Sequence, residues 1–247
     1  MPQIKTVIFD MYGTLVQNPN DTNIQIFSNV INQQGLKTTA QDLWNSWLPA
    51  EEEFQHNRLD PNTPFQSYFS AWKDGFERSF DTLKLNGAPP AATQQFFRDI
   101  SSRDPYPETN EALADIQGRY TMGLLSNADD GFLLPNLELL EVGFDVVLTS
   151  EQAQIYKPRP ELFHMILDQL GVFPGETVYV GDRQLEDVQG PLDAGMHPVW
   201  INRDKRLVDS SLPMPPHQIS SLSQLPGLLH NGLPIQPGCT NHSFKYY

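Results

Sequence analysis

Short apolar segments alternate with amphipathic helical patterns along much of the chain. Residues 4–9, IKTVIF, form a nearly continuous apolar run, which is typical of a strand buried on both faces of a parallel sheet. Further strands are expected near residues 119–125, 144–149, 176–181 and 197–202, with helical patterns near 108–118, 130–142, 160–170 and 185–194. Strands that alternate with helices in this way predict a parallel sheet with right-handed crossovers.

Residues 19–103 differ from the rest, because aromatic side chains recur there at a spacing of three to four residues. This spacing is typical of amphipathic helices, and breaks at Gly35, 61–64 and 87–90 divide the segment into about four of them. We therefore expect an α/β protein with a Rossmann-like parallel-sheet core, residues 1–18 and 104–230, and an inserted all-helical cap, residues 19–103. Residues 231–247 are expected to form a loose tail.

The composition indicates a globular protein without a cationic surface. The 247 residues carry a formal net charge of −14, and 39% are hydrophobic and 19% charged. This charge argues against nucleic acid or an anionic membrane as a partner.

The sequence also predicts where the protein is located. Its apolar runs fall short of the ~18 residues of a spanning helix, and the first strand begins too early for a secretory signal, so we expect a cytoplasmic protein. The lone Cys239 excludes a disulfide within the chain, and the oligomeric state is left open.

Polar side chains follow the predicted strands at the points where the strands end. In chain order they are Asp10, Ser126 with Asn127, Lys157, and Asp182 with Glu186 and Asp187. Because ligands bind at the carboxyl ends of parallel strands, we expect these groups to converge on one edge of the sheet. A nucleophile, a hydroxyl, an ammonium group and a carboxylate cluster at one edge indicate an active site.

Four short motifs in this region resemble those of the haloacid dehalogenase-like superfamily. They are DMYGT at 10–14, LLSN at 124–127, YKPRP at 156–160 and GDRQLED at 181–187. The resemblance extends over about residues 4–202, and the helical insertion is similar to the cap of that superfamily. It implies a hydrolase that acts on a small anionic molecule.

The resemblance also implies how substrate is bound and attacked. Asp10 is expected to be the nucleophile that forms a covalent aspartyl intermediate, which water then hydrolyses. Lys157 is expected to offset the negative charge of Asp10 and of the reacting group. The residues expected to bind substrate are Thr14, Ser126 and Asn127.

A bound Mg²⁺ is the cofactor that the resemblance implies. Its expected ligands are the carboxylates of Asp10 and Asp182 and the backbone carbonyl of Tyr12. Asp187 is expected to orient the waters of the metal or the attacking water.

Tyr12 departs from the phosphatases of the superfamily, in which an aspartate at this position protonates the leaving oxygen. A carboxyl group with a pKa of ~4 can be tuned for this task, whereas a tyrosine with a pKa of ~10 is a poor proton donor near neutral pH. A tyrosine here is similar to the 2-haloacid dehalogenase branch, because a halide leaves without a proton. Asp182, in contrast, stands at the metal-binding position of the phosphatases that this chain resembles, and dehalogenation needs no metal.

Asp182 carries more weight than Tyr12, because metal ligation demands a specific carboxylate, whereas a substrate with a good leaving group can dispense with an acid. The sequence therefore favours a Mg²⁺-dependent phosphatase that acts on a small phosphorylated metabolite. Two alternatives stay open: a metal-independent 2-haloacid dehalogenase, and a catalytically weak binding module in which Asp182 still holds a metal.

Two charged residues near these motifs are given no role in the site. Glu186 is expected to be a solvated side chain at the start of a helix. Arg58, in the acidic segment EEEFQHNR, is in a position to reach a substrate anion from the cap, but a surface role is expected for it.

Overall fold

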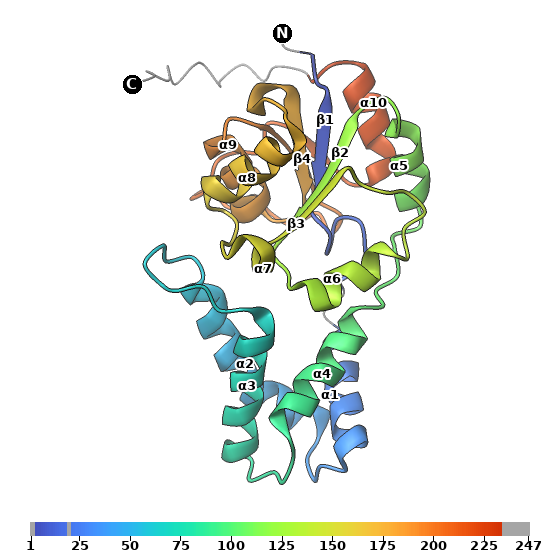
Figure 1. Ribbon diagram of the computed structural model, residues 1–247. Coiled ribbons are helices and arrows are strands. Elements are labelled where there is room, and N and C mark those ends of the chain that lie inside the picture. Colours follow the sequence, from blue (N-terminus) through green and yellow to red (C-terminus); the bar gives the residue numbers. More distant parts are fainter. Residues whose placement is uncertain (1–2, 19–20, 234–247) are drawn as a thin grey trace.

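A parallel β-sheet forms the centre of the structure, a computed structural model that describes residues 3–18 and 21–233. In this part of the chain six strands pair in the order β3-β2-β1-β4-β5-β6 (Figure 1). All of the pairs are parallel. The strands are β1 (Thr6–Phe9), β2 (Thr121–Ser126), β3 (Val146–Thr149), β4 (Thr177–Gly181), β5 (His197–Ile201) and β6 (Gln218–Ile219). The predicted Rossmann-like α/β class is confirmed, and the two-residue strand β6 is an element that the sequence pattern did not predict.

Helices cover both faces of this sheet. They are α5 (Thr109–Ile116), α6 (Asp130–Leu137), α7 (Ser150–Ala153), α8 (Pro160–Leu170), η1 (Pro174–Glu176), η2 (Leu185–Gln189), α9 (Gly190–Asp193), η3 (Leu222–Gln224) and α10 (Leu225–His230). On β1, Ile8 packs in one apolar cluster with Phe163 of α8, whereas its neighbour Phe9 packs in the other cluster with Leu113 of α5. Successive strand residues thus serve opposite faces, as the apolar run predicted.

Three helical predictions near the sheet have different outcomes. Helix α8 has the predicted bounds, because Pro160 begins it and Gly171, with a φ of 68°, ends it. Helix α6 ends at Leu137, five residues before the predicted end near residue 142. The pattern at 185–194 is divided between a π-helical turn, η2, and the short helix α9.

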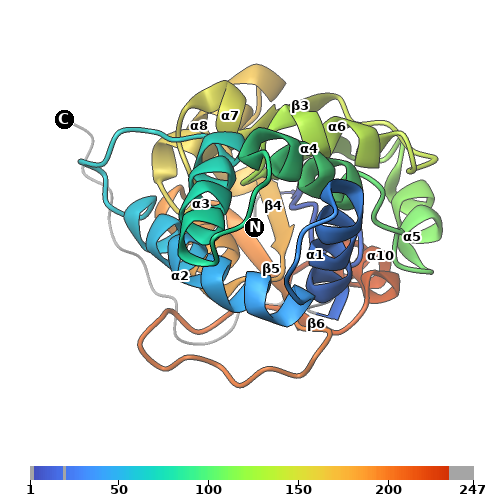
Figure 2. The ribbon, with the colours of Figure 1, turned by 90° about the horizontal axis from the view of Figure 1, so that it is seen from below.

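Four helices lie apart from the sheet in the described chain between residues 21 and 100, and we call them the helical lobe (Figures 1 and 2). They are α1 (Asp21–Gln34), α2 (Ala40–Asn57), α3 (Tyr68–Thr82) and α4 (Pro89–Ile100). Their shared interior is aromatic: the ring of Phe27 lies 5.4–5.8 Å from the rings of Trp47, Phe76 and Phe96. The aromatic spacing therefore identified the helices and their buried side. The division into a cap and a core at residues 18/19 and 103/104 stays a prediction.

Two connections join the lobe to the sheet, and they run side by side. The backbone N–H of Gln17 donates to the carbonyl oxygen of Asp104 over 2.9 Å.

A separate contact between the lobe and the sheet comes from the loop after β2, where the Asp129 carboxylate accepts hydrogen bonds from the backbone N–H groups of Tyr68 and Phe69 over 3.0 and 2.8 Å. Asp129 therefore caps the first turn of α3 from the sheet side and holds the lobe over the strand ends.

In the described part of the chain, no helix combines the length and the apolar character needed to cross a membrane. Most of the predicted tail, residues 234–247, lies outside the described residues.

Candidate active site

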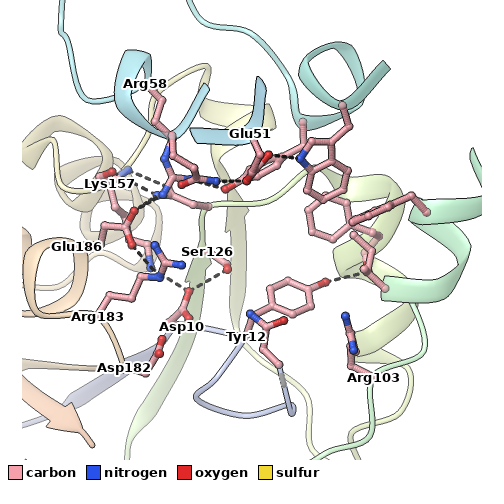
Figure 3. Close-up of a pocket in the computed structure, with 18 of the residues that line it drawn as sticks. Asp10, Tyr12, Glu51, Arg58, Arg103, Ser126, Lys157, Asp182, Arg183 and Glu186 are labelled. Carbon is pink, nitrogen blue, oxygen red and sulfur yellow. Dashed lines mark hydrogen bonds and ion pairs between the residues drawn. The ribbon is translucent and has the colours of Figure 1, made fainter. Parts of the chain in front are cut away.

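The carboxylate of Asp10 lies at the carboxyl end of the central strand β1, where neighbouring segments bring its partners. The backbone N–H of Asp10 donates to the carbonyl oxygen of Val180 on β4 over 2.9 Å, which fixes the residue to the sheet. Ser126 Oγ and Lys157 Nζ donate to Asp10 Oδ1 over 2.9 and 2.8 Å (Figure 3). Among the described residues, both hydrogen bonds to the Asp10 carboxylate are accepted by Oδ1. The other oxygen, Oδ2, is therefore free to react with a bound molecule.

Lys157 is buried and has three partners. Its Nζ donates to Asp10 Oδ1 over 2.8 Å, to Asp187 Oδ1 over 2.7 Å and to the hydroxyl oxygen of Tyr179 over 2.8 Å. Burial alone lowers the pKa of Lys157, but the charges of Asp10 and Asp187 outweigh it and hold the pKa well above the ordinary value. The ammonium group is therefore charged, and it neutralises part of a strongly acidic site.

Asn127 was expected to bind substrate, and its clearest contacts are with the backbone of Lys157. Its Oδ1 accepts the N–H of Lys157 over 2.8 Å, and its Nδ2 donates to the carbonyl oxygen of the same residue over 3.2 Å. Asn127 also lines the cavity that contains Asp10, so its substrate contact stays a prediction. Its hydrogen bonds position Lys157.

Thr14 is fully buried and does not line the cavity that contains Asp10. Its carbonyl oxygen accepts a hydrogen bond from Arg203 Nη2 over 2.8 Å. Thr14 therefore supports the turn after β1 from inside the protein, and its substrate contact stays a prediction.

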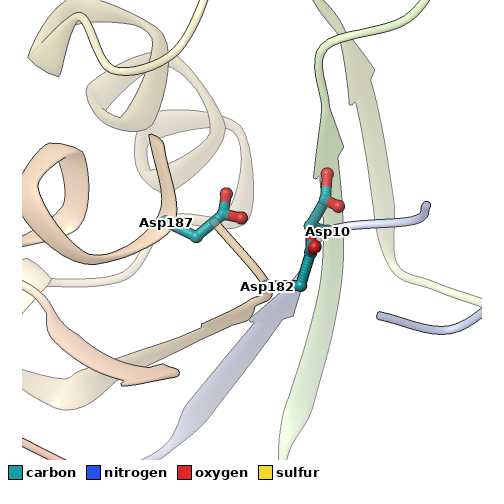
Figure 4. Close-up of side chains that lie close together, drawn as sticks. All are labelled: Asp10, Asp182 and Asp187. Atoms are coloured by element: carbon teal, nitrogen blue, oxygen red, sulfur yellow. The ribbon is translucent and has the colours of Figure 1, made fainter. Parts of the chain in front are cut away.

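Three carboxylates from different segments face one another: an oxygen of each of Asp10, Asp182 and Asp187 lies within 4.8 Å of the others (Figure 4). Gly13, with a φ of 80°, permits this approach, because a Cβ at that position would lie 2.8 Å from the Asp182 carboxyl carbon. Burial, reinforced by the neighbouring carboxylates, raises the pKa of Asp182 and raises that of Asp187 to about 7. Hard oxygen donors that repel one another at this spacing fit a divalent cation such as Mg²⁺.

The side chain of Tyr12 points away from Asp10 (Figure 3). Its hydroxyl donates to the carbonyl oxygen of Phe132 over 3.1 Å and accepts from Asn136 Nδ2 over 2.9 Å. Burial raises the pKa of Tyr12 further above its ordinary value. The Tyr12 hydroxyl is therefore a structural hydrogen-bonding group, and a catalytic proton from it is not supported by this geometry.

Arg58 and Glu186 form an ion pair between the helical lobe and the sheet, and both expectations for them were wrong. Arg58 Nη2 pairs with Glu186 Oε1, Arg58 Nη1 donates to the hydroxyl of Tyr68, and the two charged side chains are 4% and 7% exposed. Arg183 Nε lies 3.4 Å from the other oxygen of Glu186. Arg58 is not a surface residue and Glu186 is not solvated. The pair joins residues 128 positions apart, a separation at which one sequence carries no pairing signal.

A cavity of about 250 Å³ connects the carboxylates to the interior of the lobe. Its aromatic wall comes from the lobe and from α6 and consists of Trp44, Trp47, Tyr68, Trp72, Phe96 and Phe132. Its charged residues include Glu51, Arg58 and Arg103 in addition to the groups around Asp10. The cavity therefore places the carboxylate of Asp10 next to a partly apolar chamber, an arrangement typical of small-molecule sites.

Comparison with known proteins relates this site to two activities. Phosphoserine phosphatase of Thermus thermophilus is 33% identical over 195 residues, which cover 70% of this chain and 76% of that protein. N-acylneuraminate-9-phosphatase of Mus musculus is 35% identical over 122 residues, 48% of this chain and about half, 49%, of that protein. (S)-2-haloacid dehalogenase 1 of Pseudomonas sp. is 27% identical over 238 residues, 93% of this chain and 98% of that protein.

The fold is similar to that of solved dehalogenases. L-2-haloacid dehalogenase of Xanthobacter autotrophicus, solved with chloropropionic acid covalently bound, superposes with a TM-score of 0.73 at 18% identity and covers 92% of this chain and 99% of that one. At this identity the likeness shows the fold alone. The family of haloacid dehalogenase-like hydrolases matches residues 4–195. The chain belongs to this family and is a hydrolase.

Proposed function

We propose that this hydrolase is a Mg²⁺-dependent phosphatase that acts on a small phosphorylated metabolite. The observation that carries the proposal is the position of Asp182, whose half-buried carboxylate, 15% exposed, lies beside the nucleophile Asp10 and close to Asp187. Two further carboxylates next to a nucleophile that must meet an anionic phosphoryl group raise the barrier to attack unless a cation offsets their charge. Displacement of a halide from a haloacid needs no such arrangement.

The residues that would hold the cation are Asp10 and Asp182, with the backbone carbonyl of Tyr12. When bound, a divalent ion supplies positive charge that stabilises the phosphoryl oxygens and draws them toward the nucleophile. Arg206 Nη2, 2.9 Å from Asp182 Oδ2, holds that carboxylate from the outer side. Lys157 neutralises Asp10 and Asp187 from the inner side.

Asp10 Oδ2 attacks phosphorus, so that a bond forms to the aspartate and the bond to the leaving oxygen breaks. Ser126 and Lys157 keep the carboxylate in a fixed orientation through Oδ1 during this step. Water then attacks the phosphorus of the aspartyl phosphate and releases phosphate, which restores Asp10. Burial of Asp10 under the helical lobe limits the access of bulk water to the intermediate.

The leaving group receives no proton from Tyr12, because the hydroxyl is directed to Phe132. Substrates whose leaving oxygen is stable as an anion are therefore preferred. The same feature favours the second candidate function, a 2-haloacid dehalogenase, since a halide needs no proton. The dehalogenase relative that matches 93% of this chain also supports this alternative.

One experiment separates the two candidates. Phosphate release from phenyl phosphate is measured with Mg²⁺ and after EDTA, and chloride release from 2-chloropropionate is measured in parallel, with Asp10→Asn as the blank in both. Phosphate release that requires both the metal and Asp10 supports the phosphatase. Chloride release that survives EDTA and requires Asp10 supports the dehalogenase instead.

A further inference from the structure

Arg103 is a buried cation without a counter-ion in the described part of the chain. Among the described residues its guanidinium forms no ion pair within 4.0 Å, the residue is 5% exposed, and its Nε is buried without a hydrogen-bond partner. The nearby carboxylate of Asp99 accepts hydrogen bonds from Asn29 and Gln95 over 3.0 and 2.8 Å, and it forms no ion pair with Arg103. Burial lowers the pKa of Arg103, which reflects the cost of keeping this charge.

The other cations of the same cavity are all paired. Lys157 contacts Asp10 and Asp187, and Arg58 and Arg183 both contact Glu186. Arg103 therefore differs from the other positive charges that line the cavity within the described residues. A buried guanidinium with free donors is a ready site for an anion.

The backbone holds Arg103 in place while its side chain stays available. The N–H of Arg103 donates to Asn136 Oδ1 over 2.7 Å, and Asn136 Nδ2 donates to the hydroxyl oxygen of Tyr12 over 2.9 Å. Figure 3 shows Arg103 on the side of Tyr12 opposite to Asp10, with the Tyr12 ring between them. A ligand that reaches both residues must therefore extend past the Tyr12 ring along the aromatic wall of the cavity.

We propose that Arg103 is a specificity-determining residue that binds a carboxylate at the end of the substrate remote from the scissile bond. The proposal rests on the proposed function, because it takes the phosphoryl group to lie at Asp10. It defines the substrate class as phosphate esters that carry a carboxylate, separated from the phosphate by an apolar spacer. A planar carboxylate matches a guanidinium in bidentate geometry, and a single unpaired cation neutralises a monoanion.

The test uses 3- and 4-carboxyphenyl phosphate and the matched uncharged 3- and 4-carbamoylphenyl phosphates. The wild-type protein is expected to hydrolyse at least one carboxylated isomer with a kcat/KM at least about tenfold above that of its carbamoyl counterpart. In Arg103→Gln this ratio falls to near one, and in Arg103→Lys, which keeps the charge, part of it returns. Arg98→Gln, a change at an exposed arginine of α4, is the matched control and keeps the wild-type ratio.

A kcat/KM ratio near one for both isomers of the wild type overturns the proposal without any variant. A ratio that stays at the wild-type value in a folded Arg103→Gln also overturns it.

A second experiment measures binding and does not depend on turnover. Binding of the same four compounds to Asp10→Asn is followed by the fluorescence of Trp44, Trp47 and Trp72, which line the cavity. If none of the compounds is hydrolysed, the proposed function fails, and the binding data alone test the inference on Arg103. The inference is then supported if Asp10→Asn binds the carboxylated compounds more tightly than the carbamoyl compounds and loses this difference when Arg103→Gln is added. It is overturned if Asp10→Asn shows no such difference or keeps it in the double variant.

Discussion

The hydroxyl of Tyr12 donates its hydrogen bond to the carbonyl oxygen of Phe132, 3.1 Å away, and not to the reacting groups at Asp10. Asn136, fully buried, completes the arrangement by donating to the same hydroxyl oxygen. The tyrosine ring thereby lines the cavity between Asp10 and Arg103. The side chain two residues after Asp10 thus has a structural role in hydrogen bonding to Phe132 and Asn136.

The first prediction concerns the leaving group. Wild-type protein should hydrolyse 4-nitrophenyl phosphate much faster than n-butyl phosphate, because the butoxide oxygen needs a proton and Tyr12 does not supply it. In Tyr12→Asp the kcat/KM for n-butyl phosphate should rise, so that the ratio of the 4-nitrophenyl to the butyl value falls by about 100-fold, the usual contribution of a positioned acid. Tyr12→Phe is the matched control and should leave the ratio unchanged. Selective loss of butyl phosphate hydrolysis in Tyr12→Phe would show that the hydroxyl is the acid after all.

The second prediction concerns Lys157. Lys157→Met removes the cation between Asp10 and Asp187, so kcat/KM should fall by about 100-fold or more. The variant should also lose about 3 kcal/mol of unfolding free energy, because two buried carboxylates lose their partner. Lys73→Met is the control: Lys73 is half-buried, and its ion pairs within the described residues are with Asp74 and Glu77 of its own helix, at 3.6 and 3.5 Å. Urea unfolding and steady-state kinetics measure both effects, and wild-type turnover in Lys157→Met contradicts the assigned role.

Much of the site around Asp10 could be predicted from the sequence, since the carboxyl ends of parallel strands meet at one edge. This rule located Asp10, Ser126, Lys157 and Asp182 near one another before any geometry was known. It did not reveal that the chain after Gly13 turns inward and buries the side chain of Thr14. A motif position gives proximity to a site but not the direction of a side chain.

Arg58, Glu186 and Arg103 could not be identified in this way. Their significance depends on burial and on partners far away in the chain, and a charged residue in an acidic or polar segment has the same local pattern whether it is buried or solvated. The aromatic spacing in residues 19–103 predicted the helices of the lobe but not how they lie over the strand ends. That placement depends on contacts such as the Asp129 carboxylate with the N–H groups of Tyr68 and Phe69.

The third prediction concerns the ion pair between lobe and sheet. A double-mutant cycle with Arg58→Met and Glu186→Gln should give a coupling energy of about 2 kcal/mol or more in urea unfolding, because the pair is buried. The exposed pair Arg78–Glu53, with side chains 61% and 53% exposed, is the matched comparison. Its cycle should give less than about 1 kcal/mol. Equal coupling in the two cycles would mean that Arg58 does not hold the lobe to the sheet.

The fourth prediction concerns pH. Burial raises the pKa of Asp129 from its ordinary value of 3.8 to about 6, so the folded protein binds this proton more tightly than the unfolded chain. Asp129 therefore contributes stability at low pH, and the contribution is lost as the pH rises through 6. Between pH 5 and pH 7 the unfolding free energy of the wild type, relative to Asp129→Asn, should fall by about 1 kcal/mol.

A wild-type protein that gains stability relative to Asp129→Asn over the same interval would reverse the sign and reject the account of Asp129.

The most direct measurement of the central claim is the binding of Mn²⁺, a paramagnetic substitute for Mg²⁺, followed by electron paramagnetic resonance in the wild type and in Asp182→Asn. The account predicts about one bound ion per chain, an affinity reduced by about tenfold or more in Asp182→Asn, and phosphate release that increases with occupancy. The contrary result is a wild type that binds no Mn²⁺, or binds it equally well without the Asp182 carboxylate. Either outcome would remove the basis for a metal-dependent phosphatase.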